Sequence, residues 1–169
     1  MKDLKDSIIA FEQAVAATST TQPDHAKYLS NVGIGLWMLF ERTGSIDDLD
    51  RAISTNEHAV ELIPDDHPDL PKLLNSLSNG LRTRFERNGS MMDVNRAIAT
   101  SKEAVILIPP NDASRASYLN NLSVGFWSRF QRTKAMADLE NSIKAGEQAV
   151  ALIAIDNLDR PMYSRGHVS

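Results

Sequence analysis

Few residues in this chain have the types and spacing that chemistry requires. Acidic and imidazole side chains gather in one short stretch, at Asp65, Asp66, His67 and Asp69. Such side chains can ligate a metal ion, but neither HExxH nor another metal-ligand spacing is present. The alternative is that the acids cap the following helix and interact favourably with its dipole. We therefore expect no metal ion and no cofactor.

Catalysis and nucleic-acid binding find little support either. The chain holds no cysteine, which excludes a thiolate nucleophile, and its formal net charge is −4. An acidic balance does not favour nucleic acid as a partner. Five arginines could bind an anion, but they lie toward predicted helix C-termini, where cations are favoured in any case: Arg82, Arg84, Arg87, Arg129 and Arg132. These observations predict that the protein is not an enzyme and does not bind nucleic acid.

The stronger candidate is a set of side chains on one face of three long predicted helices. Trp37, Arg82 and Trp127 occupy the same slot of successive helices, and tryptophan and arginine are enriched at binding hot spots. Asparagine amides nearby could bond to a peptide backbone. The predicted peptide-binding residues are Ile34, Trp37, Asn75, Asn79, Arg82, Asn120, Val124 and Trp127.

Two structural alternatives stay open for this set. The tryptophans could instead pack against adjacent helices, with Arg82 stacked between them. The asparagines could be solvated or bonded to one another.

These slots belong to an internal repeat. Similar stretches begin at Leu4, Leu49, Val94 and Leu139, one every 45 residues without a gap. In the copy LDRAISTNEHAVELIP, apolar and small residues are spaced 3, 1, 3, 3, 1 and 3 apart, which is one stripe of an α-helix. A period of this size indicates a stack of repeated supersecondary units.

Residues with special backbone preferences mark the helix ends at the same slots of each unit. Pro64 and Pro109 end the shorter helices, since proline cannot donate the next backbone hydrogen bond. Ser45 and Ser90 are placed to cap the beginnings of these helices.

Glycine recurs in two roles. Gly44 and Gly89 suit the C-terminal caps of the longer helices, and we expect a weaker cap where Lys134 holds that slot. Glycine inside a helix costs about 1 kcal/mol relative to alanine, so its recurrence predicts a tight helix contact. These internal glycines are Gly35, Gly80 and Gly125.

The pattern predicts an all-α fold, a right-handed α-solenoid of seven helices in stacked antiparallel pairs with a 45-residue period. The array covers residues 1–154, with a half repeat at 3–18. Complete repeats follow at about 23–63, 68–108 and 113–154. Residues 155–169 lack the pattern, so we expect an irregular C-terminal tail.

The repeat resembles the tetratricopeptide repeat (TPR) family. One unit carries the matching residues Leu77, Ser78, Leu81, Ala97, Ala104 and Pro109. The usual unit is about 34 residues long, so this longer unit resembles kinesin light chain-type arrays. The phrase SYLNNLSVGFWSRFQRT resembles the repeat regions of fungal multidomain proteins that also carry an NTPase or CHAT peptidase domain. The resemblance implies a concave groove, lined by the longer helices, that receives peptides.

The functional prediction is a non-enzymatic scaffold that binds a protein or peptide partner in this groove. The alternative is a structural or regulatory spacer within a larger signalling protein, without a ligand of its own. End-to-end self-association is expected from apolar residues at both ends, namely Ile8, Ile9 and Phe11, and Val150, Leu152, Ile153 and Ile155. The sequence shows neither a secretory signal nor a membrane span, so we expect a soluble cytoplasmic protein, with the nucleus not excluded.

Overall fold

The computed structural model describes residues 2–20 and 22–159. Within these ranges the chain forms seven helices and no strand. In order they are α1 (Lys2–Ala17), α2 (Pro23–Thr43), α3 (Ile46–Leu62), α4 (Leu70–Asn88), α5 (Met91–Leu107), α6 (Arg115–Thr133) and α7 (Met136–Asp159). The predicted all-α architecture is therefore confirmed.

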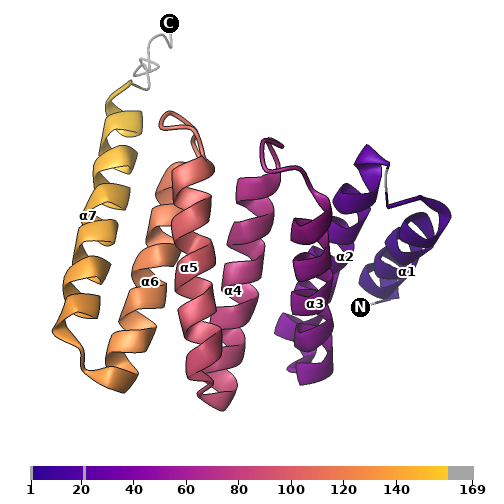
Figure 1. Ribbon diagram of the computed structural model, residues 1–169, viewed down its shortest axis with the longest axis horizontal. Helices are drawn as coiled ribbons and strands as arrows, with labels where there is room; N and C mark the ends of the chain where they lie inside the picture. Colours follow the sequence, from indigo (N-terminus) through magenta and orange to yellow (C-terminus); the bar gives the residue numbers. More distant parts are fainter. Residues whose placement is uncertain (1, 21, 160–169) are drawn as a thin grey trace, which may run out of the picture.

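The helices follow one another along the array as antiparallel neighbours (Figure 1). We call α2, α4 and α6 the A helices, and α1, α3, α5 and α7 the B helices. Each A helix packs against the B helices before and after it, and α4 also packs against α2 and α6. The backbones of successive A helices thus lie close together. Successive B helices are bridged by long side chains, as in the ion pairs Arg51–Glu12 and Arg96–Glu57. The A helices therefore line the inner side of the stack.

The core runs along the whole array in layers. Leu49 and Val94, which occupy equivalent slots at the start of α3 and α5, are fully buried. Leu81 in α4 is also fully buried, between the layers on either side. The repeated apolar slots of α3, α4 and α5 thus contribute to the shared core between neighbouring units.

The internal glycines lie where an A helix crosses the preceding B helix. A Cβ atom added at Gly80 would lie 2.9 Å from Cγ1 of Ile53. The equivalent distances are 2.7 Å at Gly35, toward Ile8, and 3.3 Å at Gly125, toward Ile98. The predicted tight helix contact is confirmed. Ile8, expected on an open end of the array, is buried beneath Gly35 instead.

The capping pattern is confirmed at both ends of the helix pairs. The hydroxyls of Ser45 and Ser90 accept hydrogen bonds from backbone N–H groups three residues later, at 3.3 and 3.4 Å. Gly44 and Gly89 have φ of 72°, in the left-handed region. Lys134 adopts the same conformation with φ of 58°, although a side chain disfavours it.

Lys134→Gly is expected to raise the free energy of unfolding by about 0.5–1 kcal/mol, because relief of left-handed strain exceeds the entropy cost of glycine. Urea denaturation would measure the change. Gly89→Ala is the matched control, since it should lower stability by introducing the same strain in α4. Equal stability of the Lys134→Gly variant and the natural chain would contradict this explanation.

Helix α7 ends later than predicted. It continues past residue 154 to Asp159, so the expectation of irregular structure is wrong for residues 155–159. The reason lies in Ala154, which stands where Pro64 and Pro109 follow the ends of α3 and α5. Without the proline, no missing N–H group interrupts the helix. The rest of the predicted tail, residues 160–169, lies outside the described residues.

Candidate functional site

The A helices place Trp37, Arg82 and Trp127 in line, but in different environments. Trp127 is 43% exposed and its ring contacts that of Phe130, with centroids 5.6 Å apart. Trp37 is half-buried and packs against two core clusters, so the packing alternative holds in part for this residue. Arg82 pairs with Glu86 one turn further along α4.

The asparagines also differ. Asn75 accepts a hydrogen bond from the Asn121 amide at 2.9 Å, so the expectation of asparagines bonded to one another holds here. Asn79 lines a cavity, whereas Asn120 is exposed on α6. Ile34 and Val124, in the slot of Asn79, are half-buried. The predicted residues thus form a mixed aromatic, amide and cationic surface.

A cavity of about 200 Å³ opens between α2, α3 and α4. Its lining residues are Gly33, Ile34, Trp37, Asn56, Ser76 and Asn79. Two of them carry buried polar atoms that have no hydrogen-bond partner, namely Nε1 of Trp37 and Oδ1 of Asn56. Buried polar atoms are normally paired, so each unpaired atom requires an explanation. Nε of Arg82 on α4 is also buried and has no hydrogen-bond partner.

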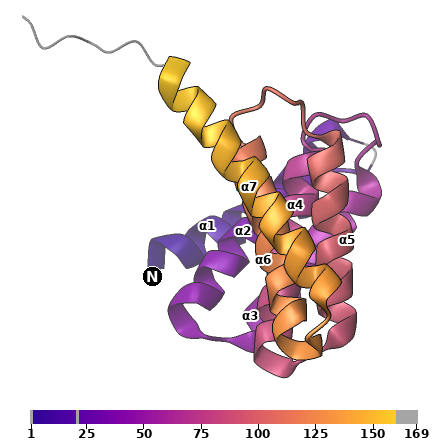
Figure 2. The ribbon, with the colours of Figure 1, turned by 90° about the vertical axis from the view of Figure 1, so that its left-hand side faces the viewer.

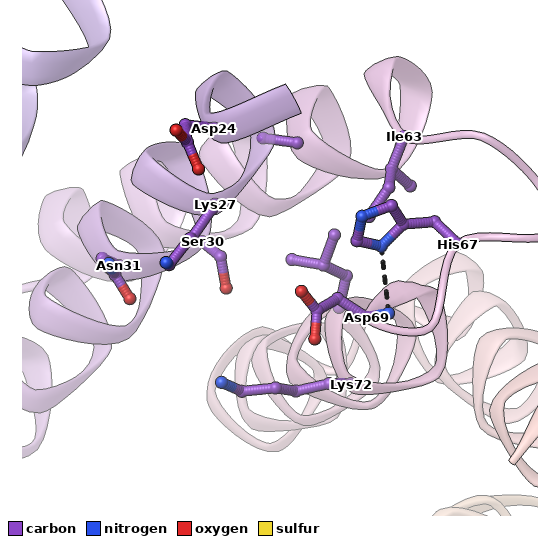
Figure 3. Close-up of a pocket in the computed structure, with 10 residues that line it drawn as sticks. Asp24, Lys27, Ser30, Asn31, Ile63, His67, Asp69 and Lys72 are labelled. Atoms are coloured by element: carbon purple, nitrogen blue, oxygen red, sulfur yellow. Dashed lines mark hydrogen bonds between the residues drawn. The ribbon is translucent and has the colours of Figure 1, made fainter. Parts of the chain in front are cut away.

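A second hollow, of about 370 Å³, lies near the N-terminal ends of α2 and α4 (Figure 3). It is lined by repeat-equivalent charges, with Asp24 and Lys27 on α2 matched by Asp69 and Lys72 at α4. His67 accepts the backbone N–H of Asp69 through Nδ1 at 3.1 Å. The charges balance, so this hollow favours neither a strongly anionic nor a strongly cationic ligand.

A third, more open hollow of about 640 Å³ lies near the C-terminal ends of α4 and α6, beside Glu86, Gln131 and Arg132. The three hollows are lined mainly by residues of the A helices. The A helices therefore contribute to separate hollows near their N-terminal ends, in their middle and near their C-terminal ends.

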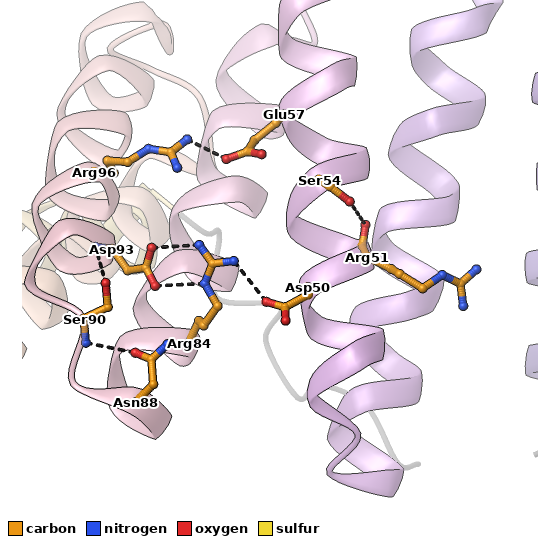
Figure 4. Close-up of polar contacts among 9 residues, drawn as sticks. All are labelled: Asp50, Arg51, Ser54, Glu57, Arg84, Asn88, Ser90, Asp93 and Arg96. Atoms are coloured by element: carbon orange, nitrogen blue, oxygen red, sulfur yellow. Dashed lines mark hydrogen bonds and ion pairs between the residues drawn. The ribbon is translucent and has the colours of Figure 1, made fainter.

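Two of the five arginines serve the fold. Arg84 donates through Nε and Nη2 to both carboxylate oxygens of Asp93, each at 2.8 Å, and through Nη1 to Asp50 at 3.0 Å (Figure 4). Arg129 makes the same paired contact with Asp138, at 2.9 and 2.6 Å. Arg129 also donates to Asn95 on α5 at 2.8 Å, so each arginine joins three helices and neither is available for an anionic ligand.

The ion pairs change the acidity of their members. Hydrogen bonding from Arg84 lowers the pKa of Asp93, against the opposing effect of burial. The same contact raises the pKa of Arg84, and the bond to Asp138 raises that of Arg129. Asp93 is a buried carboxylate whose charged form is favoured by the contact with Arg84.

The acidic stretch before α4 has no metal-binding geometry. Within residues 2–20 and 22–159, no three histidine or acidic side chains are placed to hold a metal ion. Asp69 stands at the N-cap of α4, but its side chain makes no capping hydrogen bond. The cap expected from these acids is therefore not formed by Asp69.

Sequence reasoning missed Asn56, Gly33 and Ser76. Asn56 lies in the stripe of apolar and small residues, and its slot holds Ser101 and Gly146 in the later units. The available signal was its size and polarity, since an amide in a slot of small buried residues needs a partner.

The described part of the chain folds as a TPR-like helical repeat. It is similar to a crystal structure from Podosopora anserina, which is described as nearly identical TPR-like repeats of a kinesin light chain. The TM-score is 0.56 and the sequence identity is 16%. The match covers 86% of this chain and 68% of that chain, and at this identity it concerns the fold alone. Comparisons with family models and with curated proteins gave no match. The likeness to fungal NTPase and CHAT proteins stays a prediction.

Proposed function

We propose that this protein is a non-enzymatic scaffold that binds a peptide segment of a partner protein along the inner face of its A helices. The proposal depends chiefly on one observation, namely that this indented face carries buried polar atoms without partners. A TPR-like fold is a typical protein-interaction module. In the part of the chain that the structure describes, no helix has the length and hydropathy to cross a bilayer.

The chemistry of this face suits a peptide. Trp127 offers a large, partly exposed aromatic surface, and Arg82, in the equivalent slot of α4, offers guanidinium donors. Aromatic and arginine side chains of this kind dominate binding energy at interfaces. Asn79 and Asn120 can bond to the N–H and C=O groups of a main chain.

Peptides selected from a displayed random library on the immobilised protein should depend on this face. Trp127→Ala and Arg82→Ala are each expected to weaken binding at least tenfold, since removal of a hot-spot side chain typically costs about 2 kcal/mol. Isothermal titration would measure the loss. Ile106→Ala is the control, because Ile106 is 79% exposed on B helix α5. If the selected peptides bind all three variants as tightly as they bind the natural chain, the binding site lies elsewhere.

The uncovered face of α7 favours a second function, as a unit of a longer stack. Ile143, Val150 and Ile153 are 53%, 67% and 52% exposed on it, and Figure 2 shows no described helix in front of α7. Ile143 occupies the slot that lies beneath an A-helix glycine in the earlier units. In a neighbouring copy, α1 holds the equivalent place against α2. We propose that α7 of one copy can replace α1 of the next.

Such an exchange would join copies head to tail, so the natural chain should form concentration-dependent oligomers. Ile143→Lys is expected to abolish them, because it places a charge against Gly35 of the neighbouring copy. Sedimentation equilibrium measures the mass, and Ile106→Lys is the matched control on α5. A natural chain that stays monomeric up to millimolar concentration would refute this second function.

A further inference from the structure

The cavity between α2, α3 and α4 results from one departure from the repeat. In the second unit two serines, Ser78 and Ser101, fill the equivalent space, and in the third unit Ser123 and Gly146 hold these two slots. The hydroxyl of Ser78 bonds to the carbonyl of Ala97 at 2.8 Å and contacts Ser101, and Ser123 bonds to the carbonyl of Ser142 at 2.7 Å. In the first unit the slots of Ser78 and Ser101 hold Gly33 and Asn56. The first unit therefore has a glycine and an amide where the second unit has a hydrogen-bonded hydroxyl pair.

The replacement leaves that amide incompletely bonded. Asn56 is only 4% exposed, and its Oδ1 has no partner. This oxygen lies 2.5 Å from the position that a Cβ atom on Gly33 would take, so glycine is required for Asn56 to fit. An unpaired buried acceptor is costly, unless a bound group satisfies it.

Trp37, in the same cavity wall, supplies the complementary group. Its Nε1 is a donor only, and it too is buried without a partner. The two lining residues therefore bring one unpaired acceptor and one unpaired donor to the wall of the cavity. A carboxamide carries one of each, whereas a carboxylate lacks the donor and an ammonium group lacks the acceptor.

We propose that this cavity receives the side-chain carboxamide of a glutamine or asparagine from the bound partner. A cavity of about 200 Å³ suits a single side chain rather than a whole small-molecule ligand. Oδ1 of Asn56 and Nε1 of Trp37 are shielded from solvent, so an occupant that bonds to them must be narrow enough to enter between α2, α3 and α4, as a single side chain is. This inference rests on the proposed peptide scaffold and specifies which residue the scaffold recognises.

Propionamide, which ends like glutamine, provides a test that needs no partner. The chain has two tryptophans, so a ¹⁵N-labelled sample gives two indole N–H signals. Saturable millimolar titration with propionamide should shift the Trp37 signal and leave that of Trp127 as an internal reference. N-methylacetamide, which mimics the main chain, and propionate should shift the Trp37 signal at least fivefold less.

The control variant is Gly33→Ser with Asn56→Ser, which rebuilds the serine pair of the second unit. It should fold as the natural chain does and lose the propionamide shift. An unmoved Trp37 signal in the natural chain would mean that water alone occupies the cavity, and would overturn the inference. Equal shifts from N-methylacetamide, or parallel shifts of both indoles, would overturn it as well. Peptide binding that depends on Arg82 and Trp127 would then still support the scaffold, so the two failures are distinguishable.

Discussion

Arg84→Met is expected to lower the free energy of unfolding by about 3–5 kcal/mol, because it leaves the buried carboxylate of Asp93 without its cation. Asp93 is 2% exposed, and Arg84 makes both of its short contacts with the carboxylate oxygens while also holding Asp50 on α3. The variant thus affects three helices together. Urea denaturation followed by circular dichroism would measure the loss.

The dependence on pH provides the control for this mechanism. The pKa of Asp93 is lowered in the folded state, so its stabilising contribution is complete above the unfolded value of about 3.9. That contribution is lost as the pH falls through the lowered pKa of the folded state. The difference between the natural chain and the Arg84→Met variant should therefore narrow on acidification. The double variant Arg84→Met, Asp93→Leu should recover most of the loss at pH 7. A constant difference at every pH would contradict the assignment.

Gly80→Val is expected to lower the free energy of unfolding by about 2–3 kcal/mol, because its side chain would overlap Ile53 at the crossing of α4 and α3. Both residues lie in the core, and even a Cβ atom would come within 2.9 Å of Cγ1 of Ile53. Loss of this close approach should separate the second unit from the first. Thermal unfolding and urea denaturation would both report the change.

Alanine substitutions separate packing from helix propensity, since alanine favours a helix by about 1 kcal/mol over glycine at every internal position. Gly80→Ala should be destabilising relative to Gly125→Ala, whose Cβ would lie 3.3 Å from Ile98. Gly146→Ala is the control, because its Cβ would meet Ser123 at an ordinary 3.4 Å. We expect Gly146→Ala to stabilise the protein. Equal effects at the three positions would show that propensity, rather than contact, decides the outcome.

The repeated slots carried most of the fold information. When a residue and its neighbours recur every 45 positions, a contact inferred for one unit is expected in every other unit as well. The glycine crossings and the serine caps were therefore predictable before any coordinates. The end of α7 was not, because the pattern predicted a stop that Ala154 does not enforce.

The candidate site was only partly predictable, for the opposite reason. The stripe of Trp37, Arg82 and Trp127 follows the period, but the cavity depends on Asn56 and Gly33, which depart from it. The effect of these two substitutions could be inferred only from the positions of the neighbouring side chains in the structure. The triple contact of Arg84, Asp93 and Asp50 was missed because it joins three helices that the sequence alone could not align in detail.

The ion pairs across the outer side of the array give it uneven stiffness. Glu12–Arg51 and Glu57–Arg96 tie α1 to α3 and α3 to α5, but the next slots hold Lys102 and Asn141, which carry no opposite charges. Successive A helices are in direct contact, whereas the B helices on the other side are joined by these two ion pairs. Salt screens exposed ion pairs of this kind and weakens them. Helices α5 and α7, which lack such an ion pair, should move apart most easily. A bulky partner would therefore separate these two helices first.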